Sequence, residues 1–256
     1  KGFSVEFEEH REYSPGDEIR RIDWKALGKF DRYFIKETED ETNLKANIIL
    51  DTSASMDYSS NSLTKFDYGC ILAASLAYLI LKQQDAAGVI TFSDKIESFI
   101  PPRASRSHLM ELLQALEGHT PSGETAVGKT LQEVAGKINR RGLVILISDL
   151  LDEPEAVLDG LRLFRFKGND VIVFHLLDGA ELDLPFDGNI LFEDIEEVQL
   201  RVSANPQVIR SAYLRVVREH ISRVQTSCRE NAIDYQLLPT TTPLDHAVVS
   251  YLCWRG

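Results

Sequence analysis

The sequence predicts a doubly wound α/β domain with a mostly parallel sheet and helices on both faces. Two observations support this fold class. From residue 46 onward, short apolar runs alternate with longer segments of helical periodicity. The apolar runs also lack polar alternation, which is typical of parallel strands buried on both faces. A chain of 256 residues with 43% hydrophobic content can bury the core that such a fold needs.

Each expected element follows from its local pattern. Strands are expected where apolar residues run without interruption, and helices where they recur every three or four residues. Apolar residues nearly encircle the first long helix, so we expect it to be packed on both sides. The second and third strands should pair as a hairpin across Ser93-Asp94. The expected strands are 46–50, 89–92, 96–100, 143–147, 171–177 and 235–238, and the expected helices are 65–84, 108–116, 131–138, 155–166, 206–229 and 244–252, with an irregular stretch at 184–200.

The first 45 residues differ from the rest of the chain because they are charged, aromatic and only weakly periodic. We therefore expect residues 1–45 to form an N-terminal extension packed on a domain that spans residues 46–256. Asp17, Arg20 and Asp23 are expected to form a charged network that fastens the extension to the domain, and a partner-binding surface at these residues is the alternative.

The composition of the chain limits the function classes and the cellular compartment to be considered. The net charge of −12 argues against a nucleic-acid binder, which needs clustered Lys and Arg to neutralise phosphates. The apolar stretch at residues 70–81 is too short to span a bilayer. The three cysteines are far apart and form no C-x-x-C pair, which predicts a reduced, cytoplasmic setting. The sequence starts at Lys1 rather than Met, so membrane attachment through a preceding segment stays open.

Oxygen-bearing side chains follow two of the expected strands where those strands end. Asp51, Ser53 and Ser55 come directly after the first strand, and Asp149 follows the fourth. If these strands are neighbours, the two carboxylates lie close together, because the carboxyl ends of parallel strands meet at one edge of a sheet. Thr125 adds a hydroxyl from a loop that enters a helix. This set suits Mg²⁺, which prefers oxygen ligands, and would leave a coordination position open. The alternative is that the aspartates cap helices and the serines are ordinary loop residues.

These residues resemble a known metal site. An aspartate and two serines at alternate positions, then a threonine, then an aspartate after an apolar strand, is similar to the metal-ion-dependent adhesion site of von Willebrand factor A domains. The resemblance implies that Mg²⁺ or Mn²⁺ is held partly through water and that an acidic residue of a partner takes the open position. Leu150 departs from the pattern, since many such domains have glycine there. The implied metal ligands are Asp51, Ser53, Ser55, Thr125 and Asp149.

The N-terminal segment carries a second, more specific resemblance. The runs Glu12–Asp17, Arg20–Lys25 and Ile35–Glu37 resemble a bacterial and archaeal family of A-like domains catalogued as domain of unknown function fifty-eight. The resemblance covers essentially the whole chain. Members are often encoded beside MoxR-type AAA+ ATPases, which implies an adaptor or chaperone-like partner of such an ATPase.

A phosphate-loop pattern offers a rival interpretation. Residues 123–130 fit G-x-x-x-x-G-K-[ST], and residues 143–149 could serve as a Walker B strand. A phosphate loop must connect a strand to a helix so that backbone N–H groups surround the phosphate. The segment upstream, residues 109–116, has helical periodicity, and no strand is expected between it and Gly123. In the A-domain interpretation Lys129 is a solvated helix residue. Nucleotide binding is therefore kept as a weaker alternative.

A metal-dependent phosphoester hydrolase is a further alternative. Such enzymes usually add a nucleophile, a general base or a second metal ion, and Asp57 or Asp152 would have to serve. Both are expected to be solvated loop acids, and their acidic surroundings disfavour an anionic substrate. We therefore expect a non-enzymatic module that binds Mg²⁺ and engages an acidic side chain of a protein partner, with a MoxR-type ATPase as the implied partner.

Overall fold

The computed structural model describes residues 7–12, 33–39, 44–105, 107–123, 126–138, 141–195, 201–245 and 248–249. The chain divides into two compact units, Lys1–Asn43 and Leu44–Gly256. Each unit is described by itself below.

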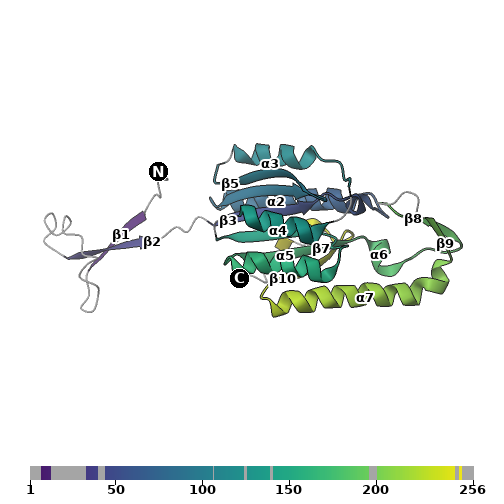
Figure 1. Ribbon diagram of the computed structural model, residues 1–256. Helices are drawn as coiled ribbons and strands as arrows, with labels where there is room; N and C mark the ends of the chain where they lie inside the picture. Colours follow the sequence, from purple (N-terminus) through teal and green to yellow (C-terminus); the bar gives the residue numbers. More distant parts are fainter. Residues whose placement is uncertain are drawn as a thin grey trace. The chain divides into compact units, whose positions relative to one another are not determined.

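The first unit contains a small antiparallel sheet. Strands β1 (Phe7–Glu12) and β2 (Phe34–Glu39) pair with each other along their full lengths (Figure 1). The expected charged network of Asp17, Arg20 and Asp23 lies outside the described residues, so it stays a prediction.

The second unit is built on a six-stranded sheet with the order β10-β7-β6-β3-β4-β5. All neighbouring strands pair in parallel except β4 and β5, which form the antiparallel hairpin predicted from the sequence. The central strands are continuous apolar runs, and every residue of β4 and β6 is buried. The strands are β3 (Lys45–Asp51), β4 (Ala86–Phe92), β5 (Ile96–Arg103), β6 (Leu143–Ser148), β7 (Asp170–Leu177) and β10 (Asp234–Pro239).

Helices cover both faces of this sheet and create two hydrophobic cores (Figure 1). The first core lies under α2 (Lys65–Lys82) and α3 (His108–Glu117). The second lies under α4 (Val127–Lys137), α5 (Pro154–Phe166) and α7 (Pro206–Glu230). The predicted α/β class with a mostly parallel sheet is therefore confirmed.

The pairing of β3 with β6 positions the candidate site. From β3 the chain crosses through α2 to β4 on one side, whereas from β6 it crosses through α5 to β7 on the other. The connections therefore diverge between β3 and β6, and such a switch point is where ligands bind in open α/β sheets. The sequence argument that these strands are neighbours is correct.

Some expected details were wrong. The helix at residues 65–84 does not pack on both sides, because Ile71 and Tyr78 are 45% and 50% exposed. The stretch at residues 184–200, expected to be irregular, contributes to a hairpin of β8 (Ile190–Glu193) and β9 (Arg201–Ala204).

Further departures concern short helices. The helical spacing expected at residues 131–138 belongs to α4, which begins at Val127 and so includes Lys129, as the A-domain interpretation expected. A short helix α6 (Gly179–Asp183) follows β7 and was not expected. Residues 244–245 and 248–249 of the expected closing helix are helical, and the remainder of it lies outside the described residues. Within the described ranges, no helix combines the length and the apolar character needed to cross a membrane.

Candidate functional site

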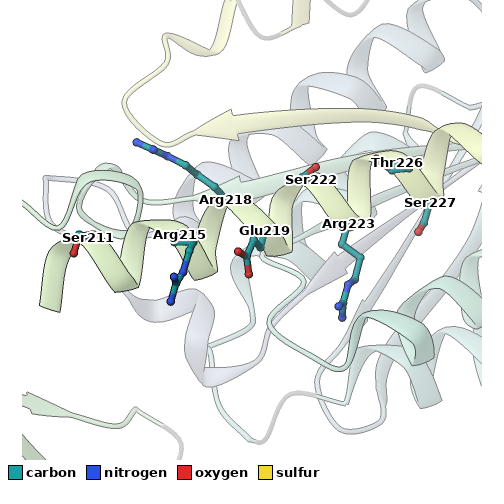
Figure 2. A pocket seen from close by; sticks show the side chains of 8 residues that line it. All are labelled: Ser211, Arg215, Arg218, Glu219, Ser222, Arg223, Thr226 and Ser227. Atoms are coloured by element: carbon teal, nitrogen blue, oxygen red, sulfur yellow. The ribbon is translucent and has the colours of Figure 1, made fainter.

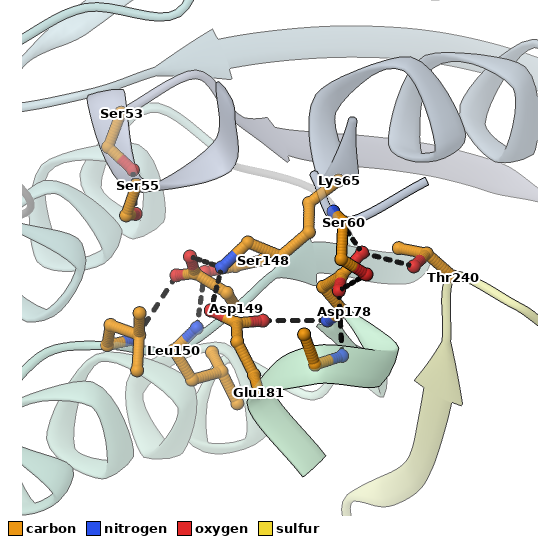
Figure 3. Close-up of polar contacts among 12 residues, drawn as sticks. Ser53, Ser55, Ser60, Lys65, Ser148, Asp149, Leu150, Asp178, Glu181 and Thr240 are labelled. Carbon is orange, nitrogen blue, oxygen red and sulfur yellow. Dashed lines mark hydrogen bonds and ion pairs between the residues drawn. The ribbon is translucent and has the colours of Figure 1, made fainter. Parts of the chain in front are cut away.

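The first loop of the site begins where β3 ends. Asp51 is the last residue of this strand, and its side chain is fully buried. The backbone N–H of Ser53 donates to Oδ1 of Asp51 at 2.9 Å. The short helix η2 (Ala54–Asp57) then turns the chain, which brings the hydroxyl oxygens of Ser53 and Ser55 within 3.1 Å of each other (Figure 3). The carboxylate and the two hydroxyls predicted as ligands therefore lie together.

The second loop follows β6 and is fixed to the first. Ser148 donates from Oγ to Oδ2 of Asp51 at 2.6 Å, and the same Oγ accepts the N–H of Leu150 at 3.0 Å. Asp149, the next residue after Ser148, is fully buried. Its Oδ1 accepts the N–H of Leu151 at 3.3 Å. The loop is therefore held by hydrogen bonds on both sides of Asp149.

The two buried carboxylates influence each other. Burial, followed by the nearby charge of Asp149, raises the pKa of Asp51 from 3.8 to about 7. Hydrogen bonds from Ser148 and Ser53 oppose this rise without cancelling it. A carboxylate that resists ionisation beside a second carboxylate is a group that a divalent cation would stabilise in its charged form.

A buried lysine, which the sequence did not indicate, lies next to Asp149. The Nζ atom of Lys65 is 2.8 Å from Oδ2 of Asp149 and 2.7 Å from Oε1 of Glu181, and the lysine side chain is fully buried (Figure 3). Burial alone would lower the pKa of Lys65, but the carboxylates of Asp149 and Glu181 outweigh it and the pKa is raised. The ammonium therefore stays charged in the interior.

Glu181 is held in place by the start of α6. Its carboxylate accepts the N–H of Asp178 at 2.7 Å, and the side chain of Asp178 accepts the N–H of Ala180 at 2.8 Å, which together form a capping box. Ser60 and Thr240 also donate to Asp178 (Figure 3). This short helix therefore presents Glu181 to Lys65 with its own backbone satisfied.

Leu150 stands where many domains with this motif have glycine. Its backbone has φ of 53°, the left-handed region that favours glycine. Its side chain is nevertheless fully buried in the second hydrophobic core. The apolar contacts of the leucine offset the strain, so the loop keeps the conformation that glycine would adopt most easily.

Thr125, the remaining predicted ligand, lies outside the described residues and stays a prediction. The chain before it is anchored to the first loop, because Ser122 donates its N–H to the carbonyl of Thr52 at 2.9 Å and the carbonyl of Gly123 accepts the N–H of Ala54 at 3.2 Å. After it, the N–H of Gly128 donates to Oδ2 of Asp152 at 3.0 Å.

The nucleotide-binding alternative fails on its local structure. Residues 118–123, which precede the glycine-lysine motif, form no strand, and Gly128 and Lys129 lie inside α4. Lys129 is exposed. A Cβ atom on Gly128 would meet the carbonyl carbon of Ala156 at 2.6 Å, so this glycine permits the close contact of α4 with α5. Its role is in helix contact rather than in a phosphate loop.

The two acids that a hydrolase would need are not placed as catalytic groups. Asp57 is exposed on η2. Asp152 is half-buried and is already engaged, because it accepts the N–H groups of Gly128 and of Glu153. It therefore serves to cap the first turn of α4.

A pocket of about 390 Å³ opens beside the site. Its polar and charged lining residues are Ser55, Lys65, Glu181 and Asp194. Among its apolar residues, Leu151 and Ile195 are 47% and 43% exposed. The other apolar residues that line the pocket are Leu184, Phe186, Phe192 and Ala180, with Tyr58 and Tyr213 beside them.

A larger and more open hollow, of about 690 Å³, lies elsewhere on the outer face of α7 (Figure 2). Arg215, Arg218 and Arg223 line it together with Glu219 and several hydroxyl residues (Figure 2). It shares no residue with the pocket beside Asp149 and none with the predicted ligands. We therefore assign it no part in the candidate site.

The side chains at the ends of β3 and β6 offer oxygen donors of two kinds, carboxylates and hydroxyls. The described residues contain no group of three or more His, Cys, Asp or Glu side chains that could hold a metal. A site here would therefore depend on hydroxyls as well as carboxylates, which is the donor set that Asp51, Ser53 and Ser55 offer and that suits Mg²⁺. These three residues fit a magnesium ion. Asp149 fits less simply, because its carboxylate is paired with Lys65.

The chain is similar in sequence to one protein family and to several uncharacterised proteins. Residues 9–223 match the profile of a family described as "Protein of unknown function DUF58". An uncharacterised protein of Mycobacterium tuberculosis is 24% identical over 224 residues, which cover 86% of this chain and 70% of that protein. The uncharacterised protein YeaD of Bacillus subtilis is 23% identical over 193 residues, which cover 75% of this chain and 45% of that protein.

Solved structures with a similar fold are more distant in sequence. The conserved hypothetical protein BatB from Bacteroides thetaiotaomicron aligns with a TM-score of 0.55 and 14% identity over 82% of this chain and 97% of that chain. An aerotolerance-related membrane protein from Bacteroides fragilis aligns with a TM-score of 0.54 and 16% identity over 80% of this chain and 94% of that chain. At such identities the likeness shows the fold alone. The shared fold is the mostly parallel sheet with helices on both faces that the sequence predicted.

Proposed function

This chain belongs to the DUF58 family of unknown function, and we propose that it is a non-enzymatic interaction module that binds Mg²⁺ and engages an acidic side chain of a protein partner. The metal would lie at the carboxyl ends of β3 and β6. Asp51, Ser53 and Ser55 would hold it, with Thr125 as a predicted further ligand and Asp149 as the second acid of the site. When bound, the metal would supply an open coordination position for the carboxylate of the partner.

One observation carries the proposal. The buried carboxylate of Asp51 lies beside the paired hydroxyls of Ser53 and Ser55 at a topological switch point. Burial and Asp149 raise the pKa of Asp51 to about 7, so ionising this carboxylate costs free energy. A bound cation would stabilise the ionised carboxylate and offset that cost.

The neighbouring pocket suggests what surrounds the acid of the partner. It has a volume of about 390 Å³ and joins the site at Ser55. Leu151 and Ile195 expose apolar surface at this pocket. We infer that the residue next to the partner's acid is a large apolar one that enters this pocket, because burying it would add affinity that the carboxylate alone does not provide.

The partner that fits the family resemblance is a MoxR-type AAA+ ATPase. The resemblance described above implies this partner, because members of the family are often encoded beside such ATPases. The adaptor role is proposed on this ground together with the geometry of the site.

Metal binding can be tested by thermal unfolding of the full chain. If the dissociation constant is on the order of 0.1 mM, then 10 mM Mg²⁺ stabilises the folded state by about 2.7 kcal/mol, a rise in Tm of roughly 5 to 10 °C. Asp51→Ala should abolish the rise. Asp57→Ala, which removes an exposed acid from the same loop, is the matched control and should preserve it. No shift of the wild-type Tm in Mg²⁺ or Mn²⁺ would contradict the metal proposal.

A second pair of measurements distinguishes partner binding from hydrolysis. Capture of the purified MoxR-type ATPase should require Mg²⁺, should be lost in EDTA and in Asp51→Ala, and should persist in Asp57→Ala. Turnover of p-nitrophenyl phosphate should be absent under the same conditions. Metal-dependent turnover that disappears in Asp51→Ala would instead identify a hydrolase and refute the non-enzymatic role.

A further inference from the structure

We propose that Lys65 is a built-in counter-cation of the candidate site, which holds Asp149 in an ion pair and thereby lowers the affinity of the site for Mg²⁺. The inference rests on the proposed function, because it concerns the metal affinity of the same site. It changes the ligand set that the sequence resemblance implies, since Asp149 would act on the metal by its charge and through water rather than by direct contact.

The geometry of Asp149 supports this role. One carboxylate oxygen, Oδ2, is 2.8 Å from Nζ of Lys65, and neither side chain is exposed to solvent (Figure 3). The other oxygen, Oδ1, accepts the N–H of Leu151 at 3.3 Å. Both oxygens of Asp149 therefore have partners within the chain. Asp51 differs, because its oxygens are bound by the N–H of Ser53 and the hydroxyl of Ser148, which are neutral donors.

A second carboxylate holds the ammonium in place. Glu181 is 2.7 Å from Nζ of Lys65, and Glu181 is itself fixed by the N–H of Asp178. To leave the site, the ammonium of Lys65 would thus have to break both ion pairs. The ammonium is a fixed part of the site rather than a mobile surface charge.

The charge balance gives the direction of the effect. When ionised, Asp51, Asp149 and Glu181 contribute three negative charges, and Lys65 cancels one of them. The remaining two match one Mg²⁺ ion. Without Lys65 the site would carry one more negative charge and would lose the repulsion between the ammonium and the metal. Both changes strengthen divalent-cation binding.

Fold stability gives no simple reason for a lysine at this position. Lys65 is the first residue of α2, where the positive end of the helix dipole disfavours a cation. Buried ion pairs are often replaced by apolar residues without loss of stability. A role in setting the metal affinity accounts for a cation that the fold alone does not favour.

The test measures Mn²⁺ and Mg²⁺ binding by titration calorimetry on the full chain. Lys65→Met should bind Mn²⁺ at least about tenfold more tightly than wild type. The matched control is Lys82→Met, which removes an exposed lysine from the last turn of the same helix and should leave the affinity unchanged. Lys65→Met leaves the buried Asp149 and the half-buried Glu181 without their cation. The variant Lys65→Met/Glu181→Gln removes one charge of each sign and is better balanced. It should also bind Mn²⁺ more tightly than wild type.

The outcomes distinguish this inference from the proposed function. If wild type binds metal and both Lys65 variants bind it equally or more weakly, the counter-cation role is overturned while the metal site stands. If wild type shows no binding but either Lys65 variant binds Mn²⁺, the role of Lys65 is supported and the proposed metal-dependent function of the native chain fails.

Discussion

Ser148 and Asp51 join the ends of two neighbouring strands. The hydroxyl of Ser148, on β6, lies 2.6 Å from Oδ2 of Asp51, on β3. The same hydroxyl accepts the N–H of Leu150. One small side chain therefore positions the first carboxylate of the site and also the loop that carries Asp149.

Ser148→Ala should lower both stability and metal affinity. It leaves a buried carboxylate with one donor fewer and removes the acceptor of the Leu150 N–H, so we expect a loss of about 1–3 kcal/mol in the free energy of unfolding. Urea unfolding measures this change. Ser75→Ala is the control, because the Ser75 hydroxyl donates to the carbonyl of Ile71 within α2, and the substitution should change stability by less than about 0.5 kcal/mol. Equal effects of the two substitutions would contradict the bridging role of Ser148.

The raised pKa of Asp51 predicts a dependence of stability on pH in EDTA. The pKa is 3.8 in the unfolded chain and about 7 in the folded protein, so the folded state retains a proton that the unfolded state releases between these values. Asp51 should therefore reduce the free energy of unfolding progressively as the pH rises from about 4 to about 7, and the reduction should persist above pH 7.

Asp51→Asn isolates this effect from the other titrating groups. Relative to wild type, the variant should gain stability between pH 5 and pH 8, by up to a few kcal/mol, since one pKa unit corresponds to about 1.4 kcal/mol. Urea unfolding at both pH values gives the difference. A stability difference that does not change with pH would show that Asp51 titrates normally.

The backbone conformation of Leu150 predicts that glycine at this position is at least as stable as alanine. Leu150→Ala and Leu150→Gly should each destabilise by about 2–5 kcal/mol, because both empty a buried site in the second core. At ordinary positions glycine is less stable than alanine, but φ of 53° removes that disadvantage. The glycine variant should thus be at least as stable as the alanine variant in urea unfolding. A glycine variant less stable by 0.5–1 kcal/mol would argue against the left-handed backbone.

Two glycines in α4 predict opposite effects of the same substitution. Gly128→Ala should destabilise by about 1–3 kcal/mol, since the added Cβ would lie 2.6 Å from the backbone of Ala156 in α5. Gly136→Ala meets nothing within 4 Å in the same helix and should stabilise by about 0.5–1 kcal/mol. Differential scanning calorimetry of both variants measures the contrast, and a stabilising Gly128→Ala would refute the close contact of the two helices.

Much of the fold was predictable because its strands are buried on both faces. The run Leu143–Ser148 has no exposed residue, and its apolar sequence reports that burial directly. The separate hairpin of β8 and β9 was missed because all of its residues are half-buried or exposed and its sequence carries little periodicity. Ile71 was misjudged for a related reason, since an apolar residue on a helix does not reveal whether another element covers it.

The candidate site was only partly predictable. Asp51, Ser53 and Ser55 are close in sequence, and the strand pattern placed Asp149 beside them. Lys65 gave no signal, because its partners Asp149 and Glu181 are 84 and 116 residues away. A lysine that follows a polar loop and begins a helix is ordinarily solvated. The burial of the Lys65 side chain is therefore seen only in the folded structure.

The two residues that flank Asp149 in space belong to different layers of the protein. Lys65 starts α2, whose apolar residues build the first core, whereas the side chain of Leu150 lies in the second. The acid therefore lies between the two layers that pack on opposite faces of the sheet. A cavity made on either side of the sheet, at Leu72 or at Leu161, should loosen the same carboxylate. The metal affinity of the site would then depend on the packing of both hydrophobic cores.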